Sequence, residues 1–185
     1  MVYTHHYESP LGGITMAGDG NALTGLWFDG TGSFGETLSA GYRDRRLPVF
    51  DETDRWLDIY FSGGIPDFTP AMNIRATAFR KTVWETLRSI PYGRTATYGR
   101  IAEQAAGQAG VPRMSARAVG GAVGHNPILL IIPCHRVVGA GGKLTGYSGG
   151  IERKAALLRM EGQAEAARNE LTFISPDNII FTTDE

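Results

Sequence analysis

The stretch 97-TYGRIAEQAAGQAGVPRMSARAVGGAV-123 decides how the second half of the chain is expected to fold. Apolar residues recur at helical spacing over 98–105, and Thr97 can cap the start of that helix. The segment Gly107–Met114 contains a proline and is typical of a turn. Ser115 can then cap a second helix, which is built of very small residues. Two short helices joined by a tight connection are typical of a helix-turn-helix.

Two glycines, Gly120 and Gly121, lie inside the second of these helices. Each costs about 1 kcal/mol of helix stability relative to alanine. Composition leaves two explanations open and equally weighted. The helix either packs closely against a neighbouring helix, or it approaches a nucleic-acid backbone closely because it carries few side chains.

The chain before this region predicts a small unit of strands and one helix. Turn signals alternate with short β-prone runs over 3–29, which predicts an antiparallel meander. A helix is expected from Asp51 and is stopped by Ser62-Gly63-Gly64. Pro66 and Pro70 then mark an irregular linker, so we expect a domain boundary near residue 75.

Three further elements are expected after the linker. Apolar residues at helical spacing predict a helix over 79–90. The β-branched run Ile128–Ile132 predicts a buried strand, and a last helix is expected to begin at Ile151 and end near Gly162. The expected fold class is α/β (α+β), with an N-terminal domain (1–75), a mostly helical second domain (76–162) and an acidic tail (163–185).

Composition and charge narrow the function classes. The 185 residues are 42% hydrophobic and 20% charged, which is typical of a globular chain that buries a core. Residues 80–160 hold 12 basic and 3 acidic residues, a net charge of +9, whereas 1–79 and 161–185 each carry −5. Such a basic block is either a solvated face or a footprint for a polyanion such as nucleic acid.

Several kinds of site and location are excluded or disfavoured. A single cysteine, Cys134, rules out an internal disulfide framework and a cysteine-built zinc site. The N-terminal residues show no secretory signal, and the aliphatic run Ile128–Ile132 is too short to cross a bilayer. We therefore expect a cytoplasmic protein without a membrane partner. A metal site at His5 and His6 is an alternative, but an N-terminal histidine pair is more often incidental, so no metal is expected.

Cys134 is the candidate for chemistry. A free cysteine after a buried strand is usually an inert small hydrophobe. Here His135 and Arg136 follow it, and such neighbours lower the pKa of a thiol from about 8.5 and make the nucleophilic thiolate accessible. A thiolate needs a base and the base needs an orienting group, so His135 could act through a bridging water while a carboxylate holds its ring. A hydrolase that uses a Cys-His pair and turns over continuously fits the same residues.

Three segments, Pro133–Val138, Ala116–Ala122 and Gly146–Gly150, together resemble the O6-alkylguanine-DNA alkyltransferases, or methylated-DNA–protein-cysteine methyltransferases. The resemblance is strong over 77–162 and covers the first 75 residues only in layout. It implies a ribonuclease-H-like N-terminal domain and a helix-turn-helix domain that binds the minor groove of double-stranded DNA and flips out a base.

The resemblance also implies the reaction. An alkyl group would pass from O6-alkylguanine in DNA, or from O4-alkylthymine, to the cysteine of a monomer. The thioether is not reversed, so each molecule would act once. No cofactor is implied, because the damaged DNA supplies the alkyl group. A non-catalytic lesion sensor of the same shape is a rival, but related sensors lack the reactive cysteine that this chain retains.

Carried over position by position, the resemblance implies three groups of residues. In the first group, Cys134 is the alkyl acceptor, and His135 and Glu161 form its proton relay. Asn126 holds the turn, and Tyr98 donates its hydroxyl hydrogen to the base. The residue that enters the base stack and its neighbours on DNA are Arg117, Ala116, Ala118 and Gly120. The residues around the alkylguanine are Tyr98, Val123, Val137 (through its backbone), Tyr147 and Ser148.

Taken without the resemblance, three of these residues would have ordinary roles. Glu161 would be a solvated carboxylate at a helix end, Arg117 a surface residue and Tyr98 a core aromatic. The sequence also departs from the family pattern at one place, because Gly107–Met114 is longer than in the shortest members. That insertion leaves the path of the turn open.

Overall fold

The computed structural model describes residues 1–32, 35, 38 and 41–168, and the chain divides into two units. Unit 1 comprises Met1–Arg75 together with Pro127–Ile131, and unit 2 comprises Ala76–Asn126 and the chain from Ile132 onward. The chain thus returns to unit 1 over Pro127–Ile131, within the range 76–162 that is expected for the second domain. Most of the expected acidic tail, from residue 169, lies outside the described residues.

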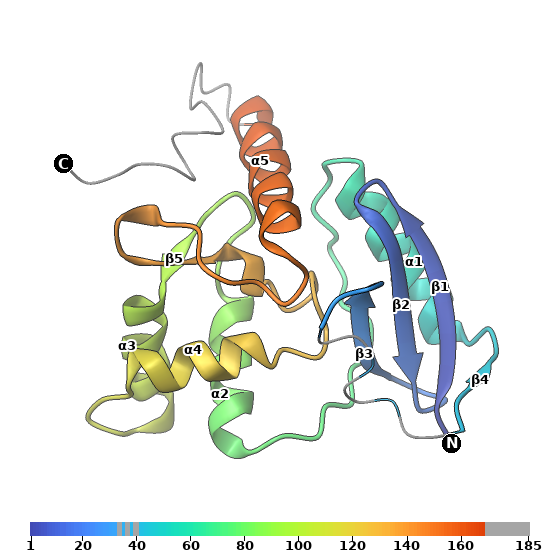
Figure 1. Ribbon diagram of the computed structural model, residues 1–185, viewed down its shortest axis with the longest axis horizontal. Helices are drawn as coiled ribbons and strands as arrows, with labels where there is room; N and C mark the ends of the chain where they lie inside the picture. The colour runs from blue at the N-terminus through green and yellow to red at the C-terminus, as the bar shows by residue number, and fades with distance from the viewer. Residues whose placement is uncertain (33–34, 36–37, 39–40, 169–185) are drawn as a thin grey trace. The chain divides into compact units, whose positions relative to one another are not determined.

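The sheet of unit 1 confirms the expected meander (Figure 1). Strands β1 (Tyr3–Ser9), β2 (Gly12–Gly18) and β3 (Leu23–Phe28) pair antiparallel in sequence order. The short strand β4 (Arg43–Asp44) joins β1 in parallel, which gives the strand order β3-β2-β1-β4. Ser9 closes the first hairpin, since its hydroxyl donates to the carbonyl of Gly12 at 2.6 Å.

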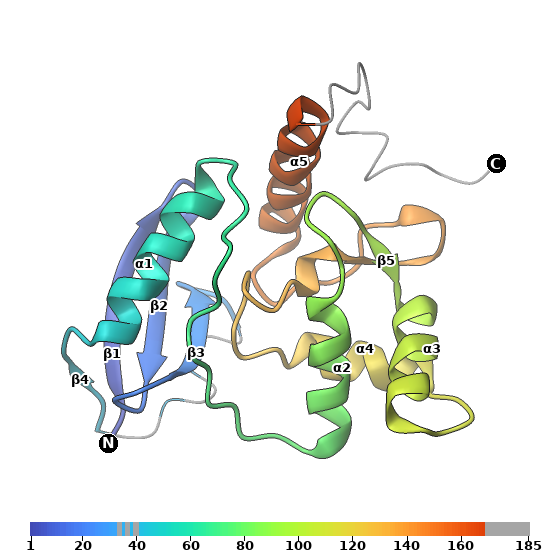
Figure 2. The same cartoon turned by 180° about the vertical axis from the view of Figure 1, so that it is seen from behind.

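Helix α1 (Pro48–Phe61) covers one face of this sheet (Figures 1 and 2). It begins three residues before the expected start at Asp51, because proline at the first helical position lacks only an N–H that has no partner there anyway. The side chains of Phe50, Leu57 and Tyr60 are fully buried and anchor the helix.

The segment 127–131 is buried as expected, but the predicted strand is wrong. The N–H of Leu26 donates to the carbonyl of Pro127 at 2.8 Å, and the N–H of Leu129 donates back to Leu26 at 3.0 Å. This is an isolated bridge beside β3 and not a ladder. Leu130 then has a φ of 69°, in the left-handed region, so the backbone turns and does not continue as extended chain.

Unit 2 is mostly helical, with three helices side by side: α2 (Ala78–Arg88), α3 (Tyr98–Ala109) and α4 (Ala116–Gly124) (Figure 1). The expected N-caps of α3 and α4 are confirmed. The hydroxyls of Thr97 and Ser115 accept hydrogen bonds from the backbone N–H three residues on, at 3.2 and 3.4 Å.

The last helix, α5, spans Ile151–Arg168 and does not end near Gly162. Glu161 is consequently inside the helix, and its side chain is buried. The interpretation of Glu161 as a solvated carboxylate at a helix end is therefore wrong.

A two-stranded parallel sheet connects the helices to the segment that carries the cysteine. Strand β5 (Ala96–Thr97) pairs with β6 (Val137–Val138), which follows the short 3-10 helix η1 (Cys134–Arg136). A second short turn, η2 (Ala140–Gly142), follows β6. Because Thr97 ends β5 and caps α3, Tyr98 is held beside the segment that carries Cys134.

In the part of the chain that the structure describes, no helix combines the length and the apolar character that crossing a membrane requires.

Candidate active site

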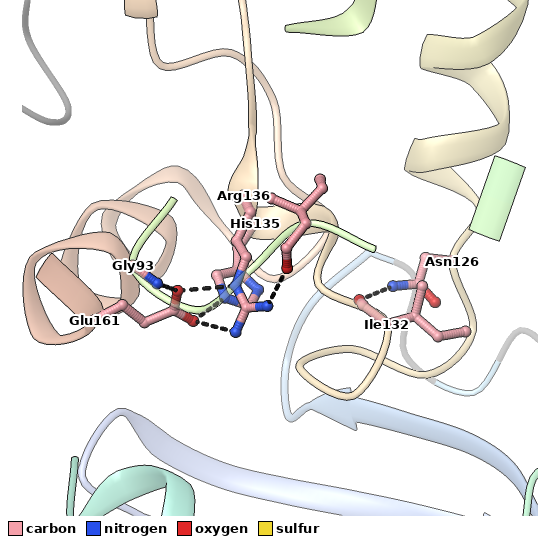
Figure 3. Close-up of polar contacts among 7 residues, drawn as sticks. Gly93, Asn126, Ile132, His135, Arg136 and Glu161 are labelled. Atoms are coloured by element: carbon pink, nitrogen blue, oxygen red, sulfur yellow. Dashed lines mark hydrogen bonds and ion pairs between the residues drawn. The ribbon is translucent and has the colours of Figure 1, made fainter. Parts of the chain in front are cut away.

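Cys134 lies in η1, and an asparagine holds it there. Asn126 is buried, and its Nδ2 donates to the carbonyl of Ile132 at 2.8 Å (Figure 3). The same Nδ2 group approaches Cys134 Sγ at 3.0 Å. The amide thus braces the turn and also donates to the sulfur.

A cavity of about 240 Å³ gives access to the sulfur, although Cys134 is only 3% exposed. Its walls come from the start of α3, the end of α4 and the loop before α5. The residues that line it are Tyr98, Gly120, Val123, Gly124, Cys134, Gly146, Tyr147 and Ser148. Five of the residues expected around the base or the sulfur are therefore brought together, and Gly120, which was expected to contact DNA, also lines the cavity.

Burial raises the pKa of the Cys134 thiol to about 11. The hydrogen bond from Asn126 and the positive charge of Lys154 oppose this shift but do not cancel it. The expectation of a lowered pKa for Cys134 is therefore wrong, because burial outweighs the lowering by its neighbours. Since the sulfur is protonated at neutral pH, a base must remove its proton before it can attack.

His135, the candidate base, is held by a buried carboxylate. His135 Nε2 lies 2.7 Å from Glu161 Oε1, and both side chains are buried (Figure 3). Arg136 donates to the same carboxylate through Nε at 2.8 Å and Nη2 at 3.0 Å, and the N–H of Gly93 donates at 3.1 Å. Glu161 is therefore the common acceptor of two side chains and one backbone group.

This arrangement fixes the protonation of His135. Burial would raise the pKa of Glu161, but His135 and Arg136 outweigh it and lower that pKa to about 2. Burial also lowers the pKa of His135, so the imidazole is neutral at neutral pH. Since an ionised carboxylate only accepts, Nε2 must carry the hydrogen. Nδ1 is then the basic nitrogen that can take a proton.

The buried charged side chains of the described residues all belong to this region: Arg136, Lys154 and Glu161. Lys154 was not predicted. Its Nζ donates to the carbonyls of Val137 and of Thr145, the second at 3.1 Å. Its pKa falls to about 8 because of burial, which the nearby Cys134 partly offsets. A lysine on the apolar stripe of the last helix, between Ile151 and Leu158, was the signal available in the sequence.

The remaining predicted residues lie apart from the cavity. Arg117, Ala116 and Ala118 are exposed on the first turn of α4, and none of them lines the cavity. The side chain of Val137 is buried, and its carbonyl is the acceptor for Lys154.

The alternative metal site finds no support among the described residues, where no cluster of three or more His, Cys, Asp or Glu side chains is placed to hold a metal ion. His5 Nε2 lies 3.0 Å from Asp54, whereas His6 Nε2 lies 2.8 Å from Glu8. The two rings point to different partners because neighbouring side chains alternate along β1.

Comparison with known proteins agrees with this geometry. Residues 78–163 match the family described as 6-O-methylguanine DNA methyltransferase, DNA binding domain. The methylated-DNA–protein-cysteine methyltransferase of Mycobacterium tuberculosis is 43% identical over 167 residues, which cover 87% of this chain and 93% of that protein. The chain belongs to the methylated-DNA–protein-cysteine methyltransferase family.

Solved structures of this methyltransferase family extend the likeness to the fold. The crystal structure of Mycobacterium tuberculosis O6-methylguanine methyltransferase has a TM-score of 0.76 at 44% identity, covering 89% of this chain and 94% of that one. A structure of the Mycobacterium tuberculosis protein in complex with DNA has a TM-score of 0.75 at 42% identity, covering 88% and 94%. The mixed α/β architecture is thus shared with these methyltransferases.

Proposed function

We propose that the protein repairs DNA by transferring the alkyl group of O6-alkylguanine to its own Cys134. The observation that carries the proposal is a lone cysteine at the wall of a cavity, beside a buried His-Glu pair, in a chain that belongs to the methyltransferase family. A Cys-His hydrolase is less well supported, because the family likeness covers most of the chain.

The reaction begins with removal of the proton from the Cys134 thiol. His135 Nδ1, with Glu161 holding the opposite nitrogen, takes the proton of Cys134 through a water, and Asn126 stabilises the thiolate. The sulfur attacks the alkyl carbon, the carbon–O6 bond breaks, and its electron pair stays on the guanine. Tyr98 donates its proton to the leaving base. His135 then releases to solvent the proton it took from Cys134, and Tyr98 regains a proton from solvent. The net change is one thioether and one repaired guanine.

The thioether explains single turnover. Thiols reverse a disulfide by attack on sulfur, but they do not displace a carbon from a thioether in this way. Each molecule therefore accepts one alkyl group and is consumed. No cofactor takes part in this scheme, because the DNA lesion is the alkyl donor.

For DNA binding, we propose that α3 and α4 form a helix-turn-helix that enters the minor groove, with Arg117 filling the gap left by a flipped nucleotide. The exposed first turn of α4, with Arg117, Ala116 and Ala118, supports this role. Gly120, from the same helix, would contact DNA as well. Val123, Tyr147 and Ser148 would surround the base, and the backbone of Val137 would face its exocyclic amine.

We also propose a monomer located in the cytoplasm, where a free thiol stays reduced. The domains 1–75 and 76–162 are proposed as a ribonuclease-H-like support and the reactive part.

Intact-mass measurement after incubation with a duplex containing O6-methylguanine tests the proposal. We expect one added methylene unit, located on Cys134 and saturating at one per molecule. Cys134→Ala should abolish transfer and retain affinity for the duplex. Continuous release of product by a catalytic amount of protein would contradict the proposal.

A further inference from the structure

The hydroxyl of Tyr98 is held by a residue outside the proton relay. Thr145 Oγ1 donates to Tyr98 Oη at 3.1 Å, and this is the hydroxyl's sole partner among the described residues. Tyr98 lines the cavity that contains Cys134, whereas Thr145 lies behind it in the loop between β6 and α5. The Tyr98 hydroxyl, which we propose donates to the base, thus already accepts one hydrogen bond from Thr145.

Two contacts fix the position of Thr145. Its carbonyl accepts a hydrogen bond from the buried Lys154 Nζ at 3.1 Å. Its methyl group is packed so closely on Gly139 that a Cβ at that glycine would lie 3.0 Å from it. With the methyl and the backbone both held, the β-branched side chain has one orientation available, and its hydroxyl points at Tyr98.

The direction of this hydrogen bond determines what Tyr98 can do. A phenol has one hydrogen. When Thr145 donates to the phenol oxygen, that hydrogen stays available for an acceptor in the cavity. A chain of two hydroxyls that ends on an acceptor is also cooperative, because each bond polarises the next one.

We propose that Thr145 is a positioning residue for alkyl transfer, which donates to Tyr98 Oη so that the proton of Tyr98 is directed to the leaving guanine. This inference rests on the proposed function and assigns no contact between Thr145 and the substrate. In the transfer step the phenol proton moves to the guanine as the carbon–O6 bond breaks, and the threonine keeps its own proton.

A double-mutant cycle tests the proposal. Single-turnover rates of methyl transfer from duplex O6-methylguanine are measured for the wild type, Thr145→Val, Tyr98→Phe and the double variant. Valine keeps the branched shape and removes the hydroxyl, so we expect transfer to be about 3- to 10-fold slower, the effect of one neutral hydrogen bond. In the Tyr98→Phe background the same change should have no further effect. Thr145→Ser should stay within about twofold of the wild type.

Two controls separate positioning from loss of structure. Alkylation of Cys134 by iodoacetamide requires no proton on a leaving base, so Thr145→Val should leave its rate unchanged. Thr82→Val removes a hydroxyl that bonds the carbonyl of Ala78 within α2, also at 3.1 Å, and should not slow transfer.

Four results would contradict the proposed role of Thr145. An unchanged rate in Thr145→Val, an equal slowing in the Tyr98→Phe background, a serine variant as slow as the valine variant, or a slower iodoacetamide reaction would each overturn the role of Thr145. Failure of the wild type to accept a methyl group would overturn the proposed function instead.

Discussion

At the scale of single residues, Glu161 controls the site because one carboxylate serves two different partners. Toward His135 it selects the tautomer in which Nδ1 is the basic nitrogen. Toward Arg136 it neutralises a buried cation, which also donates to the carbonyl of Ile90 at 2.8 Å and lies 5.4 Å from the ring centre of Tyr92. The proposed proton relay and the stability of the fold therefore depend on the same negative charge.

Glu161→Gln should slow alkyl transfer and destabilise the fold. A neutral amide can donate to His135 as well as accept from it, so the tautomer is no longer fixed, and we expect transfer to slow by about 100-fold or more. The uncompensated Arg136 should lower the free energy of unfolding by about 3–5 kcal/mol. Single-turnover kinetics and urea unfolding measure the two effects. Exposed Glu103→Gln in α3 is the control, and a Glu161→Gln variant with wild-type transfer would contradict the relay.

The pKa of Glu161 also predicts acid sensitivity. Its pKa is about 2 in the folded protein and about 4.5 when unperturbed, so the ionised form favours folding above pH 4.5. The difference corresponds to about 3 kcal/mol, which is lost progressively as the pH falls from about 5 to 2. Urea unfolding at several pH values should show this loss in the wild type. Glu161→Gln should lack that component, and an equally steep loss in the variant would contradict the assignment.

Arg117 allows a test of DNA binding that leaves the chemistry alone. Because it is exposed on α4 and does not line the cavity, Arg117→Ala should slow transfer from a duplex and leave the reaction with free O6-benzylguanine within about twofold. Arg113→Ala, an exposed arginine in the preceding turn, is the matched control for charge. Equal slowing with both substrates would contradict the insertion of Arg117 into the base stack.

The sequence indicated the reacting residues but not the buried charges that support them. Cys134, His135 and Glu161 were predicted from a family resemblance, and the structure brings the histidine and the glutamate together. The pairing of Arg136 with Glu161 and the contacts of Lys154 were missed, since both depend on how α5 packs against η1. The raised pKa of Cys134 was also missed, because the extent of burial is a property of the folded chain.

At the scale of elements, α4 distinguishes the two explanations for its glycines. A Cβ at Gly120 would lie at 3.7 Å from the ring of Tyr98, an ordinary contact, and a Cβ at Gly121 would meet nothing within 4 Å. Close packing therefore does not explain Gly121. The other explanation, a helix face kept bare for close approach to DNA, therefore stays our proposal for Gly121.

Gly121→Ala should consequently stabilise the fold and weaken DNA binding. We expect the free energy of unfolding to rise by up to about 1 kcal/mol, the difference in helix propensity. Affinity for a duplex should fall, and Gly121→Leu should lower it further. Gly107→Ala in α3 is the matched control, because that glycine also has nothing within 4 Å of its Cβ position. Urea unfolding and fluorescence anisotropy measure the effects, and unchanged DNA affinity in both Gly121 variants would contradict the proposed face.

Elements were predictable where local chemistry decides them. Thr97 and Ser115 cap α3 and α4 as expected, since capping involves only nearby backbone. The strand expected over 128–132 was wrong because pairing with Leu26 and the left-handed turn at Leu130 are tertiary features. Helix α5 continues through Gly162. A single glycine lowers helix propensity by only about 1 kcal/mol, which is too little to end this helix.

At the scale of the whole molecule, the basic residues proposed to bind DNA and the residues proposed to transfer the alkyl group differ in how salt should affect them. The +9 block over 80–160 lies between segments of −5 each, so the total of −1 conceals a basic segment, which we propose as the part that attracts phosphate. Cys134, His135 and Glu161, which we propose as the transferring group and its relay, are buried, and burial protects them from screening by salt.

Salt should therefore affect the two activities differently. Raising the salt concentration from about 50 to 200 mM should weaken binding to an undamaged duplex by at least about tenfold, because bound counterions are released from DNA when cations of the protein contact phosphates. The reaction of Cys134 with free O6-benzylguanine, which is uncharged, should change by less than about twofold. Anisotropy titrations and intact-mass kinetics on the same samples measure both. A free-base reaction as salt-sensitive as duplex binding would mean that the basic block acts on the chemistry and not on the phosphates.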